Sequence, residues 1–197
     1  MNPPKAQDPT PTPNADDVRL PIATPSQTVG PFFFFGLTPD DRLGSLADTA
    51  VGERLHLHVR ILDGVGMPVS DSLIEIYQAN AAGEYGTPAF RGFGRLATHA
   101  DGTCTFETIR PGRVAAPQGG TQAAHINVCV FARGLLRHLY TRVYFAGDPD
   151  LDTDPLLALV PAERRATLLA RSAAGAAGSW EWEIRLQGDG ETVFFDL

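Results

Sequence analysis

A histidine and an asparagine two residues apart, His125 and Asn127, come closest in this sequence to the spacing of a metal site. They lie in the stretch 122–133, which is apolar and β-branched, lacks proline and is bounded by glycines, a pattern that predicts a strand. Side chains two apart on a strand point to the same side, so we expect His125, Asn127 and Cys129 to share one face. A His-x-His pair there would offer two imidazole ligands to a metal, whereas Asn127 offers only a weak neutral oxygen.

Short strands separated by turns are predicted for most of the chain. Apolar and polar residues alternate at a period of two over 54–62, and Asp63-Gly64 and Asp101-Gly102 mark turns. A proline at the start of 161–171, an acid near that start and an arginine at the end predict a short helix. We therefore predict a mainly β chain with an antiparallel β-sandwich core, long loops and one short helix. Further strands are expected over 72–77, 103–109, 138–145, 180–186 and 191–196, and long loops over 79–94 and 110–120.

The first 20 residues differ in composition from the rest of the chain. They are rich in proline and cannot form a core, which predicts a flexible N-terminal arm. Residues 21–197 are predicted to form a single domain, since this length suits one large hydrophobic core. Prolines keep 21–31 extended, and four phenylalanines follow at 32–35. As a strand, these would send two rings to each face, so the segment is expected to be either a subunit interface or a buried core strand.

Composition and charge exclude several classes of protein. The 197 residues carry a formal net charge of -7 with a pI of about 5.1, which disfavours nucleic acid because a phosphate backbone requires a basic surface. No apolar run approaches the roughly 18 residues that a membrane span requires, so no membrane partner is expected. Cys104 and Cys129 fall on separate predicted strands without a CxxC motif, which favours reduced thiols in a cytoplasmic protein.

Several sequence blocks, in order along the chain, resemble the intradiol ring-cleaving dioxygenases. They run from about residue 24 to the C-terminus, and several blocks in the right order are far more specific than one motif alone. The resemblance implies the family's fold and a ferric ion held by two tyrosinates and two histidines, a donor set that suits this hard cation. The blocks are Thr24-Pro-Ser-Gln-Thr28-x-Gly30-Pro31, Asp63-Gly64, Asn80-Ala-x-Gly83-x-Tyr85, Arg110-Pro-Gly112, Ala124-His125-Ile126 and Tyr144-Phe145.

The resemblance puts suitable donors at two of the four ligand positions. Tyr85 matches the first tyrosine and His125 the first histidine. Arg113 stands at the second tyrosine position and Asn127 at the second histidine position, while Gln122 replaces an arginine that catalytic chains carry three residues before the histidine. A guanidinium cannot ligate a metal and repels it. We therefore expect these five positions to be a vestigial site that binds no iron, and we hypothesise that Arg113 fills the vacant space.

The resemblance is strongest to family members built of two homologous chain types, α and β, which convert protocatechuate and O2 to 3-carboxy-cis,cis-muconate. This chain resembles the α type, which implies a β partner that carries the Fe(3+) in an α/β hetero-oligomer. It also implies that this chain has no catalytic residue of its own and lines the substrate pocket with Thr28, Gly30, Pro31 and Arg133. An arginine there suits a substrate whose carboxylate is remote from its catechol oxygens.

Two other functions stay open from the sequence. One is a self-sufficient catechol-type dioxygenase with a different ligand set, and the other is a non-enzymatic β-sandwich that serves binding or assembly. His56 and His58 form a His-x-His pair on a predicted strand, but no further ligand types accompany them, so we interpret them as part of a polar outward face. The acids of 148–154 lack the regular spacing of a calcium site and are expected to form a loop.

Overall fold

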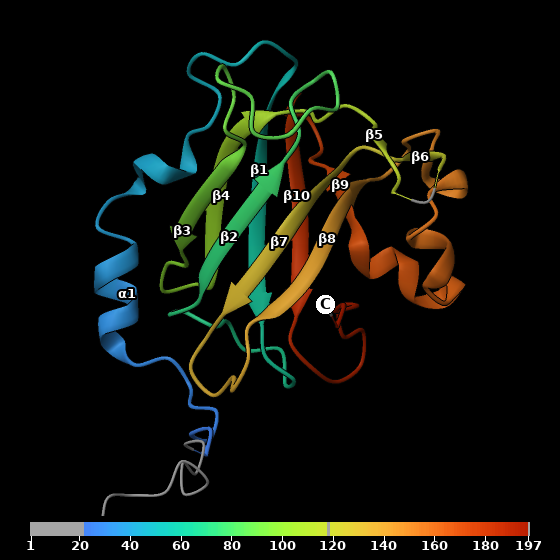
Figure 1. Cartoon of the computed structure of the whole chain (residues 1–197). Helices are drawn as coiled ribbons and strands as arrows, with labels where there is room; N and C mark the ends of the chain where they lie inside the picture. The colour runs from blue at the N-terminus through green and yellow to red at the C-terminus, as the bar shows by residue number, and fades with distance from the viewer. Residues whose placement is uncertain (1–21, 118, 197) are drawn as a thin grey trace, which may run out of the picture.

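The computed structural model describes residues 22–117 and 119–196, which are mainly β (Figure 1). The predicted arm at 1–20 lies outside the described residues. One α-helix precedes the strands, and short 3-10 helices (labelled η) lie between several later elements. In chain order the elements are α1 (Pro31–Leu37), η2 (Asp41–Gly44), β1 (Arg54–Leu62), β2 (Leu73–Gln78), β3 (Phe93–Ala97), β4 (Thr103–Ile109), β5 (Val114–Ala115), β6 (Thr121–Gln122), β7 (His125–Phe131), β8 (Leu139–Phe145), η3 (Leu151–Thr153), η4 (Leu157–Leu159), η5 (Ala162–Leu168), β9 (Leu169–Ser172) and β10 (Ser179–Arg185).

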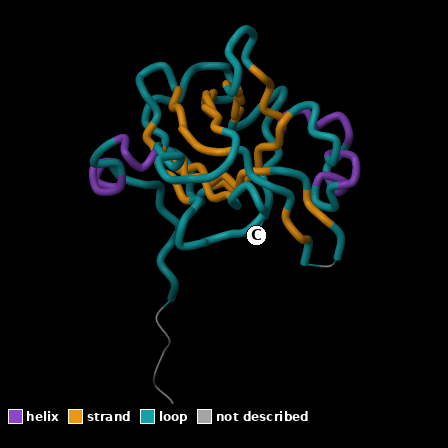
Figure 2. Tube along the Cα trace, turned by 90° about the horizontal axis from the view of Figure 1, so that it is seen from above, coloured by secondary structure: helices purple, strands orange, loops and turns teal. Residues whose placement is uncertain are grey.

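Within the described residues, eight strands form one sheet in the order β3-β2-β7-β8-β9-β10-β1-β4, and β5 and β6 form a separate hairpin. The pairs β1/β10 and β8/β9 are parallel, and the other neighbours are antiparallel. The end strands β3 and β4 contact each other, so the sheet curls almost into a barrel, as the view from above shows (Figure 2). Helical segments lie on two opposite sides of this curled sheet (Figure 2).

Side chains at every second strand position fill the interior of the curled sheet. Along β1, the side chains of Leu55, Leu57, Val59 and Ile61 are buried, whereas the residues between them are exposed or half-buried. This is the alternation that predicted the strand, and each buried aliphatic side chain contributes about 1.5–3 kcal/mol. The other strands contribute in the same way, with Ile74, Ile76, Phe106, Ile126, Val128, Val130, Val143, Trp182 and Ile184 among the core residues.

The mainly β prediction is confirmed, but the antiparallel sandwich is not, because the sheet is mixed. Parallel neighbours need a crossover connection, and residues 146–168 supply one between β8 and β9 with 3-10 helices in place of the predicted α-helix. The helix predicted at 161–171 is therefore wrong in type and length. η5 ends at Leu168, since the next residues pair with β8 as strand β9.

Two further segments differ from the sequence-based expectation. The phenylalanine segment is not extended but forms helix α1, which begins at Pro31. Proline suits the first helical position because that N–H has no partner within a helix. The strand expected at 191–196 is reduced to one bridge between Phe195 and Tyr140.

The long loop 79–92 after β2 and the short loop 110–113 after β4 are held tightly against each other. The backbone N–H of Gly112 donates to the carbonyl of Asn80 at 2.9 Å. The side-chain oxygen of Asn80 accepts hydrogen bonds from Ala82 N and Glu84 N, which fixes the turn that leads to Tyr85. Gly83 lies in this turn with φ +84°, and a Cβ atom there would lie 1.9 Å from the carbonyl oxygen of Arg113. The glycine thus allows two backbones to approach so closely.

The substitution Gly83→Ala is expected to lower the free energy of unfolding by about 2 kcal/mol or more. About 1 kcal/mol arises from the left-handed backbone, and the remainder arises from the forced separation of the two loops. Gly147→Ala is the matched control, because φ there is +85° and no atom lies within 4 Å of the added Cβ. Urea unfolding of both variants measures the difference, and equal losses would show that the loops are not in close contact.

Candidate functional site

The residues matched to the family's iron-ligand positions lie close together around the outer face of β7, except Arg113, whose side chain pairs with Asp150. Asn127 on β7 pairs in register with Tyr77 on β2 and with Arg142 on β8, so these three side chains form a row across the sheet. His125 lies two residues before Asn127 and pairs in register with Tyr144. The loop after β2 brings Tyr85 over this row, with its ring centroid 5.1 Å from that of Tyr77. The expectation that His125 and Asn127 share a face is confirmed.

A chain of hydrogen bonds links the histidine, the tyrosine and the asparagine. His125 is buried, and its Nδ1 lies 2.8 Å from the carbonyl oxygen of Ala123. A carbonyl can only accept, so Nδ1 carries the proton and Nε2 is left with its lone pair. The hydroxyl of Tyr85 lies 3.1 Å from Nε2 and donates to it, and Asn127 Nδ2 donates to the same hydroxyl oxygen at 3.1 Å. The nitrogen that would ligate a metal is therefore already an acceptor.

Arg142 completes this network from β8. Its Nε donates to Asn127 Oδ1 at 2.8 Å, and its terminal NH1 donates to Gln122 Oε1 at 2.5 Å. The Gln122 amide in turn donates to the carbonyl of Ala115 at 3.3 Å. Sequence reasoning missed Arg142, because one arginine on a strand carries no signal until the register places it opposite Asn127.

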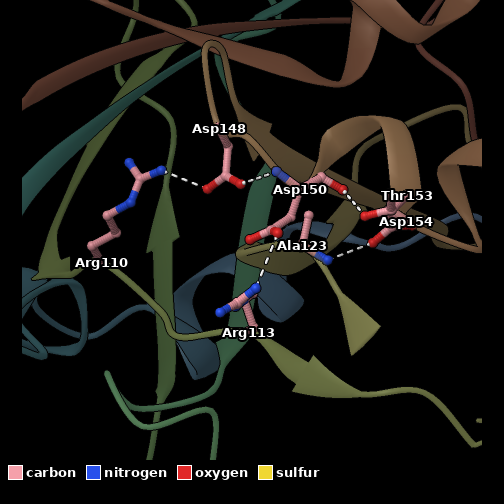
Figure 3. Close-up of polar contacts among 7 residues, drawn as sticks. All are labelled: Arg110, Arg113, Ala123, Asp148, Asp150, Thr153 and Asp154. Atoms are coloured by element: carbon pink, nitrogen blue, oxygen red, sulfur yellow. Dashed lines mark hydrogen bonds and ion pairs between the residues drawn. The ribbon is translucent and has the colours of Figure 1, made fainter. Parts of the chain in front are cut away.

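The hypothesis that Arg113 fills the vacant space is wrong. Its side chain is 63% exposed and its NH1 lies 3.1 Å from Asp150 Oδ1 (Figure 3). Asp148 holds Arg110 in the same manner, at 2.8 Å. Asp148 and Asp150 thus tie the loop after β4 to the connection between β8 and β9, and the loop expected at 148–154 includes the 3-10 helix η3.

Asp154 anchors the backbone just before His125. It is fully buried, and one of its carboxylate oxygens accepts from the Ala123 N–H at 2.8 Å (Figure 3). The other oxygen accepts from the Tyr144 hydroxyl and from two backbone N–H groups, Leu156 N and Leu157 N. Four donors compensate the burial of this carboxylate, and the carbonyl of Ala123 is thereby held in place for His125.

The electrostatics of the site keep both potential ligands neutral. Burial, followed by the nearby Arg142 guanidinium, lowers the pKa of His125 to about 4. Burial raises the pKa of Tyr85 above its usual value, although the hydrogen bond from Asn127 opposes this. At neutral pH the site therefore holds a neutral imidazole and a protonated phenol, with Arg142 as its cation.

A separate apolar cavity lies near the other end of β7. It has a volume of about 320 Å³. Phe131, which lines it, lies six positions after His125 on β7, a distance of roughly 20 Å. Its walls are aromatic and aliphatic except for one ion pair, in which Arg133 Nε donates to Asp71. The lining residues are Val29, Gly30, Phe33, Phe35, Asp71, Leu73, Phe131 and Arg133.

Of the four predicted pocket residues, two line this cavity and the other two lie close to them in the chain. Gly30 and Arg133 line it. Thr28 is not among the lining residues, but its hydroxyl accepts a hydrogen bond from Gly134 N at 2.8 Å and so ties the segment before α1 to the residue after Arg133. Pro31 is the first residue of α1. The structure thus brings the predicted residues to one region.

Comparison with known proteins now identifies the family. A dioxygenase family model matches residues 29–188. The chain is 43% identical to the protocatechuate 3,4-dioxygenase alpha chain of Burkholderia cepacia, over 88% of this chain and 97% of that protein. The chain belongs to the intradiol dioxygenase family. It is also 37% identical to the protocatechuate 3,4-dioxygenase beta chain of Burkholderia cepacia, over 70% of this chain and 66% of that protein.

A solved structure of a dioxygenase domain agrees with this assignment. The dioxygenase domain of a carbohydrate-binding fusion protein from Streptomyces sp. SirexAA-E superposes on the chain with a TM-score of 0.60. The two are 27% identical, and the match covers 84% of this chain and 99% of that one.

Iron does not fit the donor set of this intradiol dioxygenase chain. The lone pair of His125 Nε2 is engaged by the Tyr85 hydroxyl, and Asn127 donates to the phenol oxygen. The Arg142 guanidinium, a cation, is bound to the side chain at the second histidine position. Among the described residues, no group of three or more His, Cys, Asp or Glu side chains is placed to hold a metal ion.

The histidine pair of β1 and the two cysteines lie outside the hydrogen-bonded network around His125. His56 and His58 lie on the outward face of β1, and His58 bonds to the hydroxyls of Thr105 and Ser179, as expected for a polar outward face. Cys104 and Cys129 are both free and buried. No helix within the described residues is long and apolar enough to cross a membrane.

The depressed pKa of His125 predicts a loss of stability in mild acid. The unfolded imidazole takes up a proton near pH 6.5, whereas the folded one does so only near pH 4. Between these values the unfolded state binds more protons, so the free energy of unfolding falls as the pH decreases from about 6.5 to about 4, with a slope of at most about 1.4 kcal/mol per pH unit from this group. Urea unfolding across this range measures the slope.

Two variants isolate the contribution of His125. His125→Gln removes the titrating group and is expected to flatten the slope below pH 6.5. His99→Gln, at an exposed position, is expected to leave it unchanged. Identical slopes in all three proteins would contradict a neutral, buried His125.

Proposed function

We propose that this chain is the α subunit of a protocatechuate 3,4-dioxygenase and that a homologous β chain holds the catalytic Fe(3+). Its likeness to relatives named as alpha and beta chains of that enzyme supports both the activity and the α/β hetero-oligomer. Iron bound by the partner supplies the activation of the catechol towards O2. Free, buried thiols support a reducing, cytoplasmic location.

The observation that carries this proposal is the separation of the cavity from the vestigial ligands. Roughly 20 Å of strand separates Phe131 from His125, so a substrate in the cavity is far from the only residues of this chain that match iron ligands. A metal that reacts with such a substrate must come from another polypeptide. The lack of a fitting donor set around His125 supports the same conclusion.

The walls of the cavity suit an aromatic acid. Phe33, Phe131 and Leu73 offer apolar surface to a ring, and Gly30 allows a close approach of the backbone. Arg133 is 73% exposed and engages Asp71 through Nε, which leaves the other N–H donors of the guanidinium for a substrate carboxylate. We assign to this chain the binding and orientation of substrate, with Thr28, Gly30, Pro31 and Arg133 on its side of the pocket.

Co-expression with the β chain is expected to be required for activity. The purified α chain alone should contain no stoichiometric iron and take up no oxygen with protocatechuate, whereas the α/β complex should do both. Iron analysis and an oxygen electrode measure the two quantities. Iron and activity in the chain alone would indicate a self-sufficient dioxygenase. A complex without activity would indicate a binding or assembly module.

Arg133→Ala in the α/β complex is expected to raise the KM for protocatechuate about tenfold, because loss of a charge-assisted hydrogen bond costs about 1.5–3 kcal/mol and partial exposure reduces this. The KM for catechol, which lacks the carboxylate, should change little. Arg137→Ala, four residues further on and also exposed, is the control. Equal changes for both substrates would remove the carboxylate role from Arg133.

A further inference from the structure

The site has kept a guanidinium but receives it from a different strand. The family resemblance implies that catalytic chains carry an arginine at the position of Gln122, three residues before the histidine. In this chain the Arg142 side chain crosses from β8 and lies 2.5 Å, measured from its NH1, from Gln122 Oε1. An arginine and a glutamine therefore form a pair at this place.

The position of Arg142 has a second consequence, which concerns the ligand position itself. Its Nε donates at 2.8 Å to Asn127, the residue at the second histidine position, and these two residues are in register on adjacent strands. A histidine at 127 would accept this N–H with the lone pair that a metal needs, or would be repelled by the guanidinium once protonated. The Arg142 guanidinium is thus hydrogen-bonded directly to the residue at the second histidine position.

The surrounding groups hold Arg142 there. Asn127 Nδ2 donates to the Tyr85 hydroxyl and to the Tyr77 carbonyl, which leaves its oxygen directed to the guanidinium. Gln122 is buried and uses its amide group on the Ala115 carbonyl, which leaves its oxygen as the second acceptor. Both acceptors would lose a charge-assisted partner if Arg142 were removed.

We propose that Arg142 is a relocated guanidinium that closes this site to iron, so that the missing ligands alone do not explain why the site cannot bind metal. Restoring the ligands without moving the guanidinium leaves the site closed. Returning the guanidinium to position 122 opens it. This inference concerns the isolated chain and does not depend on the partner or on the substrate.

A double-mutant cycle tests the relocation. Gln122→Arg brings two guanidinium groups together and Arg142→Gln removes the shared one, so each single change is expected to lower Tm by roughly 3–6 °C. The double variant, Gln122→Arg with Arg142→Gln, restores the pair with its partners exchanged and should recover most of this loss. Arg60→Gln, an exposed outward residue of β1, controls for the loss of surface charge. If the Tm losses of the two single changes simply added in the double variant, the inference that Arg142 has taken over this guanidinium position would be wrong.

Iron content tests the closure. The triple variant Arg113→Tyr, Gln122→Arg, Asn127→His is expected to purify without iron. Adding Arg142→Gln is expected to give stoichiometric iron and the visible colour of a tyrosinate–iron bond, and a further Tyr85→Phe should remove much of that colour. Equal iron in the triple and quadruple variants would overturn the closure. A folded quadruple variant without iron would also overturn it.

Discussion

The hydrogen-bond chain from the Ala123 carbonyl to Arg142 is the constraint on which the rest of the site depends. His125 donates at one nitrogen and accepts at the other, and Tyr85 both donates and accepts. Asn127 donates to Tyr85 through its nitrogen and accepts from the Arg142 guanidinium through its oxygen. Each hydrogen bond fixes the direction of the next, because a group that donates its only proton to one neighbour can only accept from another. The fully bonded network also removes the cost of burying these polar groups.

The fold supplies this constraint from four separate segments. β7 and β8 provide the register, the loop after β2 provides Tyr85, and the buried Asp154 carboxylate holds the backbone before β7. The same strand β7 carries the vestigial ligands near one end and a wall of the aromatic cavity near the other. One strand thus connects residues whose donor set does not fit iron with an apolar cavity, which is the arrangement that the proposed role as a substrate-binding subunit requires.

The sequence predicted the strands well where alternation alone determines them. The bounds of β1 and β4 match the predicted ones because a one-sided apolar pattern permits only one register. Helix α1 was missed because its four phenylalanines carry no amphipathic period, and the mixed sheet was missed because strand order depends on contacts far apart in the chain. Strand β9 was not predicted, because it has only four residues and directly follows a segment whose sequence resembles a helix.

The residues of the candidate site could be named from the sequence, but their contacts could not. The family blocks pointed to Tyr85, Arg113, His125, Asn127 and Gln122, and the structure brings all but Arg113 into one hydrogen-bonded network. The partner of Arg113, by contrast, is Asp150 on a loop 37 residues away, and the register that brings Arg142 to Asn127 follows from strand pairing. Neither contact leaves a trace in local sequence, since both depend on where the chain folds back on itself.

The tautomer of His125 tests the account most directly. Nitrogen-15 NMR of the isolated native chain reports the protonation of each imidazole nitrogen, with and without a ferric chelate. We expect a protonated Nδ1 and an Nε2 that is unprotonated and hydrogen-bonded. The His125 signals should neither shift nor broaden when ferric ion is added. A proton on Nε2, or a His125 signal that disappears with ferric ion, would contradict this expectation.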